Sequence, residues 1–283
     1  VYDAAIVQPI YRVSDRDLWK IVDVGLIAGA VNSAGASVSG WRQVLHFGAQ
    51  VLVLALSPSS YRRVQRHRLL HAIYRATMPL LPSFTAISAV AALIIIRIVL
   101  ATALSYGLSR YALDVLVRTL VLELIPLSAA LFAALRYAMP AGEQVRAMRL
   151  RGEFETQLAA GHDPTRDRVL PRAAAAAFAV ITLAAVSCAL TLVLAYVSVY
   201  GFVTWGLEGF TRTVGQVFSP VIVLIFTLKT FFLSVAVAII PMVPTPAEGA
   251  SGAARVYADI TRLARLFAVV LLIEMVSLVG NYY

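Results

Sequence analysis

The chain has 283 residues, of which 60% are hydrophobic and 14% charged, and its mean hydropathy is +0.82. Soluble domains average about 45–50% apolar and about 25% charged residues, so this composition excludes a soluble domain, a disordered chain and a fibrous repeat. The net charge of +9 does not by itself indicate nucleic-acid binding, because arginine accumulates in the cytoplasmic loops of membrane proteins. The single cysteine, Cys188, excludes an intrachain disulfide and a cysteine metal cage.

The first 42 residues precede the hydrophobic part of the chain. Charged residues are spread over the first 20 positions without an apolar run, so we expect no cleavable signal peptide. Two interpretations of segment 1–42 stay open: it lies along the membrane surface, or it binds a partner.

Five stretches are long and apolar enough to cross a bilayer, which requires a helix of about 20 mainly apolar residues. A sixth stretch, Val44–Leu56, has only 13 residues, and we interpret it as part of an interfacial helix over about 44–75. The alternative is a short sixth span. Because lipid forces backbone groups to hydrogen-bond within each segment, the sequence predicts an all-α integral membrane protein. The predicted spans are Met78–Ser105, Val115–Ala138, Ala173–Thr204, Val217–Val243 and Leu263–Tyr283.

The arginine and lysine residues outside the spans alternate along the chain. They number nine, one, six, one and two in segments 1–77, 106–114, 139–172, 205–216 and 244–262. Because basic residues concentrate in cytoplasmic loops, this pattern predicts a cytoplasmic N-terminus. Five spans then place the C-terminus on the periplasmic side. A sixth span would break the alternation, which favours the interfacial interpretation of the first apolar stretch.

The loop 139–172 is the longest hydrophilic connection and carries charges of both signs. Its segment Gly142–Ala160 has a composition compatible with a helix, Gly161 is a natural stop and Asp163-Pro164 a turn. Pro171 precedes the third span, as proline often does at a helix start. A charged helix between two spans suggests a docking element; the alternative is a solvated loop.

Four charged residues lie inside the predicted spans. Each costs about 2.5–3.5 kcal/mol at the bilayer centre, so each needs a partner, a cavity or a route to the headgroups. Arg97 and Glu123 lie in the outer halves of their spans, and we expect them at similar depth. Lys229 and Glu274 lie near mid-span, where snorkelling to the interface explains Lys229 poorly. We therefore predict that Glu274 pairs with Lys229.

Catalytic motifs are missing from the sequence. It contains no G-x-x-x-x-G-K-[ST] phosphate loop, no G-x-S-x-G elbow and no H-E-x-x-H zinc motif. His67 and His71 are one helical turn apart but lie among arginines, so we expect no metal site. The sequence thus predicts a protein that is not an enzyme; an integral membrane enzyme acting on lipids has no residue pattern in its favour.

Short motifs recur along the chain in an order that resembles the MlaE-type (MlaE/YrbE) permeases, the membrane subunits of ABC systems that move phospholipid between bacterial membranes. The resemblance covers roughly residues 43–283. The motifs are Leu70–Arg75 with Leu81-Pro82, Tyr106-Gly107, Leu122–Pro126, Arg136, Asp163-Pro164, Pro171-Arg172, Lys229, Gly249–Arg255 and Glu274.

Some positions depart from the family pattern. Leu122 and Ile125 replace an arginine and a glycine, and Leu135 replaces the glycine before Arg136. The family's coupling-helix pattern is replaced by a different acidic run, Gly152–Gln157. The chain therefore resembles a divergent member.

The resemblance implies an interfacial helix, five spans, a permease domain over 43–283 and a location in the bacterial inner membrane. It implies a second permease copy, as homo- or heterodimer, and a lipid cavity opening to the periplasm. It further implies a periplasmic MCE-type lipid-binding subunit and a separate ABC ATPase, which would bind ATP and Mg²⁺; no cofactor and no nucleic acid are expected on this chain. The implied lipid-binding residues are Ile98, Ala101, Thr102 and Glu123. We expect Arg97 to bind the lipid phosphate, because arginine is well suited to phosphate groups.

For ATPase coupling, we expect the partner to dock on Gly142–Gly161, with Glu153 and Glu155 supplying charge and Phe154 an apolar anchor. The alternative function is a non-transporting scaffold, the degenerate half of a heterodimeric permease, suggested by the lost glycines and the altered coupling helix.

Overall fold

The structure, a computed structural model, describes residues 40–57, 63–244 and 253–282. The chain divides into two units, Val1–Leu45 and His46–Tyr283, and the candidate site lies in the second. Most of the predicted N-terminal segment 1–42, and Gly249–Gly252 of the glycine-rich motif, lie outside the described residues.

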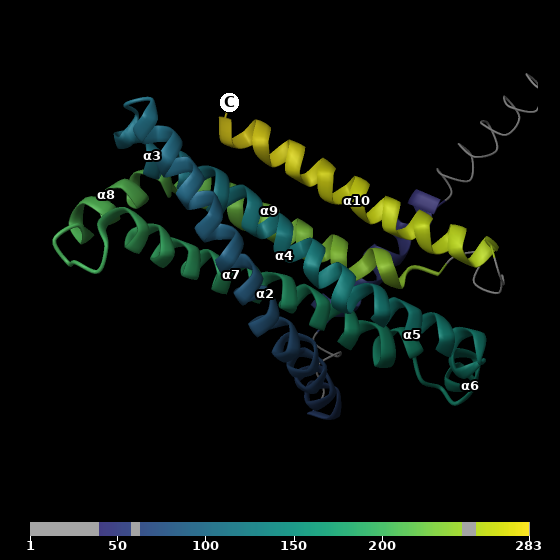
Figure 1. The fold of residues 1–283 in the computed structure, drawn as a ribbon. Coiled ribbons are helices and arrows are strands. Elements are labelled where there is room, and N and C mark those ends of the chain that lie inside the picture. Colours follow the sequence, from purple (N-terminus) through teal and green to yellow (C-terminus); the bar gives the residue numbers. More distant parts are fainter. Residues whose placement is uncertain (1–39, 58–62, 245–252, 283) are drawn as a thin grey trace, which may run out of the picture. The chain divides into compact units, whose positions relative to one another are not determined.

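All regular secondary structure in the described ranges is helical. A helix over residues 40–56 comes first. The labelled elements follow in this order (Figure 1): α2 (Arg63–Ser105), α3 (Ser109–Leu116), the π-helix η2 (Val117–Leu124), α4 (Ile125–Ala133), the π-helix η3 (Ala134–Ala138), α5 (Met139–Leu150), α6 (Glu153–Ala159), the π-helix η4 (Thr165–Val169), α7 (Leu170–Tyr200), α8 (Leu207–Val217), α9 (Pro220–Ile239), the 3-10 helix η5 (Ile240–Met242) and α10 (Ala253–Tyr282).

Within the described residues, five helical segments are long and apolar enough to cross a membrane, which confirms the five predicted spans. The helix over residues 40–56 is not among them. The segments are Arg66–Ser105, Tyr111–Leu150, Thr165–Tyr200, Pro220–Met242 and Ala258–Asn281.

The predicted helix over about 44–75 is wrong in its boundaries. The structure has one helix ending at residue 56 and a second, α2, that runs without interruption from Arg63 into the first span. The change from charged to apolar residues near Met78 marks the point where the helix enters the apolar layer. It does not end the helix, because backbone hydrogen bonding continues across it. At about 1.5 Å per residue, a 43-residue helix is far longer than the roughly 30 Å hydrocarbon core, so part of α2 lies beyond it.

The loop between the second and third spans also differs from the single helix expected over Gly142–Ala160. Gly152 has φ = +72°, a left-handed conformation that ends α5 and starts the separate helix α6. Gly161, with φ = +76°, ends α6 as predicted, and Pro171 lies in the first turn of α7.

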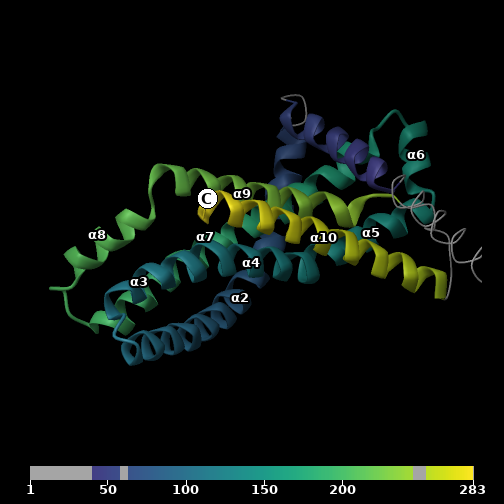
Figure 2. The same ribbon diagram turned by 90° about the horizontal axis from the view of Figure 1, so that it is seen from above.

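The helix α7 is the centre of the bundle, and α2, α4 and α9 pack against it, while α10 packs on α9 (Figure 2). Small side chains on α7, including the fully buried Ala175, Ala176 and Ala179, let neighbouring backbones approach closely. In both views α3 and α8 lie at one end of the bundle and α5 and α6 at the other. We call these the α3–α8 end and the α5–α6 end.

Candidate functional site

Three charged side chains from three spans meet inside the bundle. The Nζ atom of Lys229 on α9 donates hydrogen bonds to Oε2 of Glu123 on η2 and, over 2.8 Å, to Oε1 of Glu274 on α10. The side chain of Lys229 is 1% exposed, so it is held by these partners and does not reach an interface. The predicted pairing of Glu274 with Lys229 is confirmed. Glu123, which was expected at the depth of Arg97, contacts Lys229 in the same cluster as Glu274.

The backbone around Glu123 takes part in this cluster. Proline has no N–H group, so Pro126 cannot donate to the carbonyl of Leu122 four residues earlier. Lys229 donates to that carbonyl over 3.2 Å, and the thiol of Cys188 donates to the preceding carbonyl, of Val121, over 3.4 Å. The π-helical geometry of η2 thus directs two successive carbonyls towards neighbouring helices, a use of π-helices that is common at functional sites.

Asn281 completes the cluster from the last turns of α10. Its Nδ2 atom donates a 2.7 Å hydrogen bond to Oε1 of Glu123. Three polar atoms of α10 near the cluster are among the buried atoms without a hydrogen-bond partner in the described part of the chain: Oε2 of Glu274, Oγ of Ser277 and Oδ1 of Asn281. Buried atoms of this kind cost about 1–3 kcal/mol each, so the polar contacts of α10 in this region are incomplete. We call Glu123, Lys229, Glu274 and Asn281 the polar cluster.

The five residues expected to bind lipid fall into two groups. Arg97, Ile98, Ala101 and Thr102 are exposed and share one face of α2, because positions three and four apart lie together on a helix. Glu123 is buried, at 7% exposure, inside the polar cluster. In this chain the structure brings together the four α2 residues and does not bring Glu123 to their surface.

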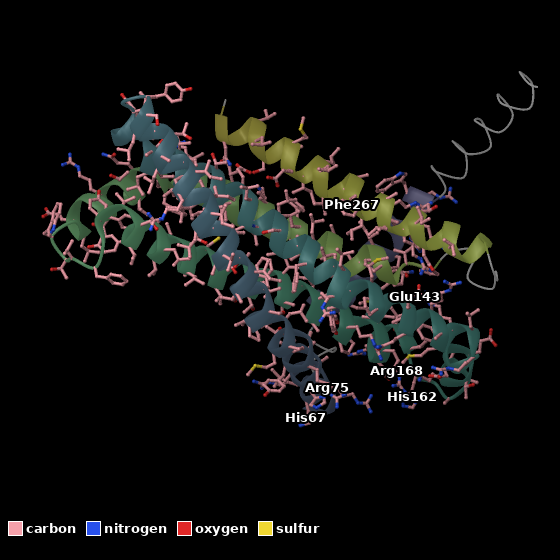
Figure 3. The ribbon with its side chains drawn as sticks, viewed as in Figure 1. His67, Arg75, Glu143, His162, Arg168 and Phe267 are labelled. Atoms are coloured by element: carbon pink, nitrogen blue, oxygen red, sulfur yellow. The ribbon has the colours of Figure 1, made fainter. Side chains whose placement is uncertain are left out.

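A second charged network lies at the α5–α6 end. Nη1 of the buried Arg146 on α5 lies 3.3 Å from Oδ1 of Asp259, and Nη1 of the buried Arg262 on α10 lies 2.9 Å from Oε1 of Glu143. We call these four residues the α5–α10 network; Figure 3 labels Glu143, below α10. Arg149 adds a 2.9 Å hydrogen bond to the carbonyl of Met242 in η5. The two ion pairs between α5 and α10, and the hydrogen bond from Arg149 to η5, would have to break before α5 could move without these elements.

Close backbone packing accompanies this network. A Cβ atom built on Gly142 of α5 would lie 2.2 Å from the carbonyl oxygen of Pro241 in η5. Only glycine therefore permits this approach of α5 to the end of α9.

We expect Gly142→Ala to lower the free energy of unfolding by about 1–3 kcal/mol, because the added methyl group meets backbone that cannot turn away. Gly215→Ala in α8 is the matched control, since a Cβ there meets nothing within 4 Å. Thermal unfolding in detergent, followed by circular dichroism, measures the effect. An unchanged or higher unfolding temperature for Gly142→Ala would show that α5 and η5 are not tightly packed at this position.

The three residues expected to dock an ATPase lie on the short helix α6. Glu153 forms a 2.9 Å ion pair with Arg151, and Glu155 is exposed. The guanidinium of Arg149 lies 5.4 Å from the ring centroid of Phe154, which is half-buried. The helix therefore presents acidic groups outward and is tied through Arg149 to α5 and η5.

Some site residues were missed by reading the sequence. Asn281 lies seven residues after Glu274, on the same helix face, and this spacing could have indicated it. Arg146 and Arg262 were counted only as loop charges, and no local pattern distinguishes them from exposed arginines.

These features define a polytopic α-helical membrane protein with a buried ionic centre and a charged helix pair between its second and third spans. A family model described as Permease MlaE matches residues 69–280, well over half of the chain, so the chain belongs to the MlaE permease family. Membership implies a permease subunit of an ABC lipid transporter. Comparison with curated proteins gave no match.

Proposed function

We propose that the chain is the permease subunit that moves phospholipid, or a related lipid, between the bacterial inner membrane and a periplasmic MCE-type lipid-binding partner. A separate ABC ATPase powers the movement and binds the ATP and Mg²⁺. The observation that carries this proposal is the family match over residues 69–280. A second permease copy, identical or related, completes the lipid cavity.

The distribution of arginine supports a definite orientation. At the α5–α6 end, segment 139–172 carries six basic residues and the start of α2 adds Arg66, Arg68 and Arg75, whereas the α3–α8 end carries one basic residue in each of its loops. By the positive-inside rule the α5–α6 end faces the cytoplasm, where an ATPase acts, and the α3–α8 end faces the periplasm.

The helix contacts supply a route by which an ATPase could act on the spans. Docking on α6 moves α5, and the α5–α10 network together with Gly142 and Arg149 carries that motion to η5 and α10. Deeper in the membrane, the polar cluster connects α10 to η2 and α9. In this mechanism α9 and α10 move with α5.

The α2 face has the chemistry of a lipid site. Ile98 and Ala101 offer apolar contacts, and the guanidinium of Arg97 is suited to a phosphate oxygen because it presents several N–H donors in one plane. Among the described residues, no carboxylate forms an ion pair with Arg97. A largely apolar surface with few polar groups is typical of sites for lipids.

We expect Arg97→Ala to reduce phospholipid binding about tenfold, because a hydrogen bond to a charged group contributes about 1.5–3 kcal/mol. The measurement is the lipid phosphorus retained per protein after purification in a mild detergent. Arg212→Ala, which removes an exposed arginine of α8, is the control for charge. Equal lipid content in Arg97→Ala and the unmodified chain would exclude this role for Arg97.

The function itself is tested by purifying the tagged chain from its own membranes in a gentle detergent. Mass spectrometry then identifies the bound proteins and lipids. We expect an ABC ATPase at one copy per permease, phospholipid and a periplasmic lipid-binding subunit. A chain that comes out alone and without lipid, under conditions that preserve a known ABC complex, would contradict the proposal.

The second candidate is a non-transporting scaffold, the degenerate half of a heterodimeric permease. Its specific support is that Leu122 and Ile125, which replace an arginine and a glycine of the family pattern, are buried in the apolar core beside the polar cluster. A second permease with the intact motifs in the purified complex would favour this candidate.

A further inference from the structure

A basic cavity of about 570 Å³ lies between the start of α2, α5 and the junction of η4 with α7. Arg75 and Arg168, labelled in Figure 3, come from two of these elements. Tyr137 and His71 contribute further polar atoms to the lining. The charged residues of the lining are Arg68, Arg75, Arg168, Arg172 and Asp167.

The arginines of the cavity outnumber its carboxylates four to one. Among the described residues, no acidic side chain forms an ion pair with Arg68, Arg75 or Arg168. Nη1 of Arg172 donates a 2.7 Å hydrogen bond to the carbonyl of Arg168, which holds these two residues close together. Neighbouring guanidinium groups repel one another, so an anion in the cavity would be attracted by several of them at once.

The cavity lies where three spans leave the apolar layer. Arg75 comes three residues before Met78, the start of the first apolar run, and Arg172 comes directly before the run that begins at Ala173. Tyr137 is near the end of the second apolar run, and tyrosine is typical of the level of the lipid headgroups. Arg75 and Arg172 therefore border the apolar layer, at the level where lipid phosphates are found.

An apolar stripe runs along α2 beside the basic residues. Leu70, Tyr74 and Met78, spaced four residues apart, are each more than half exposed. Arg75 and His71 lie on the adjacent face of the same helix. A free phosphate would use the arginines only, whereas a lipid would place its headgroup in the cavity and its acyl chains along this stripe.

We propose that the cavity binds the phosphate headgroup of an anionic phospholipid, with its acyl chains against Leu70, Tyr74 and Met78. Basic pockets between spans on the cytoplasmic side are suited to such headgroups. This site is separate from the α2 face around Arg97, and its occupation requires neither transport nor a partner subunit. It therefore stands independently of the proposed function.

The test uses the purified full-length chain in a zwitterionic detergent. Dioleoylphosphatidylglycerol and, as the neutral lipid, dioleoylphosphatidylcholine are titrated in mixed micelles, and native mass spectrometry counts the bound lipid. We expect the anionic lipid to bind more tightly. In Arg68→Gln/Arg75→Gln its affinity falls on the order of 30-fold, since each arginine near the surface contributes about fivefold.

A matched control separates this site from general charge. Arg66→Gln/Arg212→Gln removes two exposed arginines, one on the opposite face of α2 and one on α8, and should leave the affinity unchanged. Since all the replaced residues are exposed, the variants should fold, and their circular dichroism spectra check this.

Three results would overturn the proposal. The first is equal affinity for the two lipids, and the second is an unchanged affinity in Arg68→Gln/Arg75→Gln. The third is complete displacement of the anionic lipid by millimolar inorganic phosphate, which would show a site for free phosphate. If Arg68→Gln/Arg75→Gln no longer captures the ATPase but binds lipid as before, the basic cavity is a protein contact and the lipid binds elsewhere.

Discussion

Replacing Lys229 with methionine should lower the free energy of unfolding by about 3–5 kcal/mol, the cost of removing one partner from a buried ion pair. The substitution leaves the carboxylates of Glu123 and Glu274 together without their common cation. It also leaves the carbonyl of Leu122 without a donor, since Pro126 cannot supply one. Methionine keeps the approximate length of the side chain, so the loss measures charge and hydrogen bonding more than volume.

The measurement is thermal unfolding in detergent. The reaction of Cys188 with a maleimide dye monitors the unfolding. Cys188 is the only cysteine of the chain and is buried, so its reaction reports opening of the bundle. Because Cys188 donates to a backbone carbonyl next to the cluster, circular dichroism is the second probe that distinguishes local loosening from unfolding.

A combined variant keeps this prediction specific. Lys229→Met with Glu123→Gln and Glu274→Gln removes both orphaned charges, and we expect it to regain most of the lost stability. An exposed control, Arg212→Met, should have no effect beyond a few tenths of a kcal/mol. If Lys229→Met unfolds at the temperature of the unmodified chain, the polar cluster does not hold the three spans together.

Glu153→Lys/Glu155→Lys should abolish capture of the ABC ATPase while leaving the membrane-embedded helices intact. Glu155 is exposed. Replacing Glu153 with lysine removes its ion pair with Arg151 and places two positive charges beside each other. Like charges facing a partner that is complementary to the original pair cost several kcal/mol, enough to prevent assembly. Because α6 has no buried residue, the reversal does not disturb the core.

Co-purification of tagged permease with the ATPase, quantified as their stoichiometry, measures this effect. The single variant Glu155→Lys is compared with Glu208→Lys, which reverses one exposed charge in the first turn of α8 at the opposite end. Only the first should weaken capture. Normal stoichiometry in the double variant would mean that the ATPase docks elsewhere on the chain.

Some parts of the candidate site could be predicted from the sequence. The mid-span position of Lys229 made an internal partner necessary, because a charge at that depth cannot reach the interface. Glu274 was the obvious acid at a similar depth. Glu123 was assigned to the lipid site by the family resemblance, and its expected depth, similar to that of Arg97, does not tell which way the side chain faces.

Some helix boundaries could likewise be predicted from the sequence, and others could not. Gly161 and Pro171 were recognised because each acts through its own backbone geometry. Gly152 was read as an ordinary helical residue, although it separates α5 from α6 with φ = +72°. A glycine adopts either sign of φ with little cost, so its own residue type did not decide which one the chain requires.

The sequence by itself determined the helical class, the five spans and the distribution of basic residues between the two ends. These properties depend on composition over windows of about 20 residues, and lipid allows only one backbone solution for such a window. Only the tertiary structure decided which charges meet. Lys229 is 106 residues from Glu123 and 45 from Glu274, and Arg262 is 119 from Glu143. Such contacts depend on the rotation and packing of each helix against its neighbours, which small side chains on α7 and the single glycine at position 142 permit and no local pattern encodes.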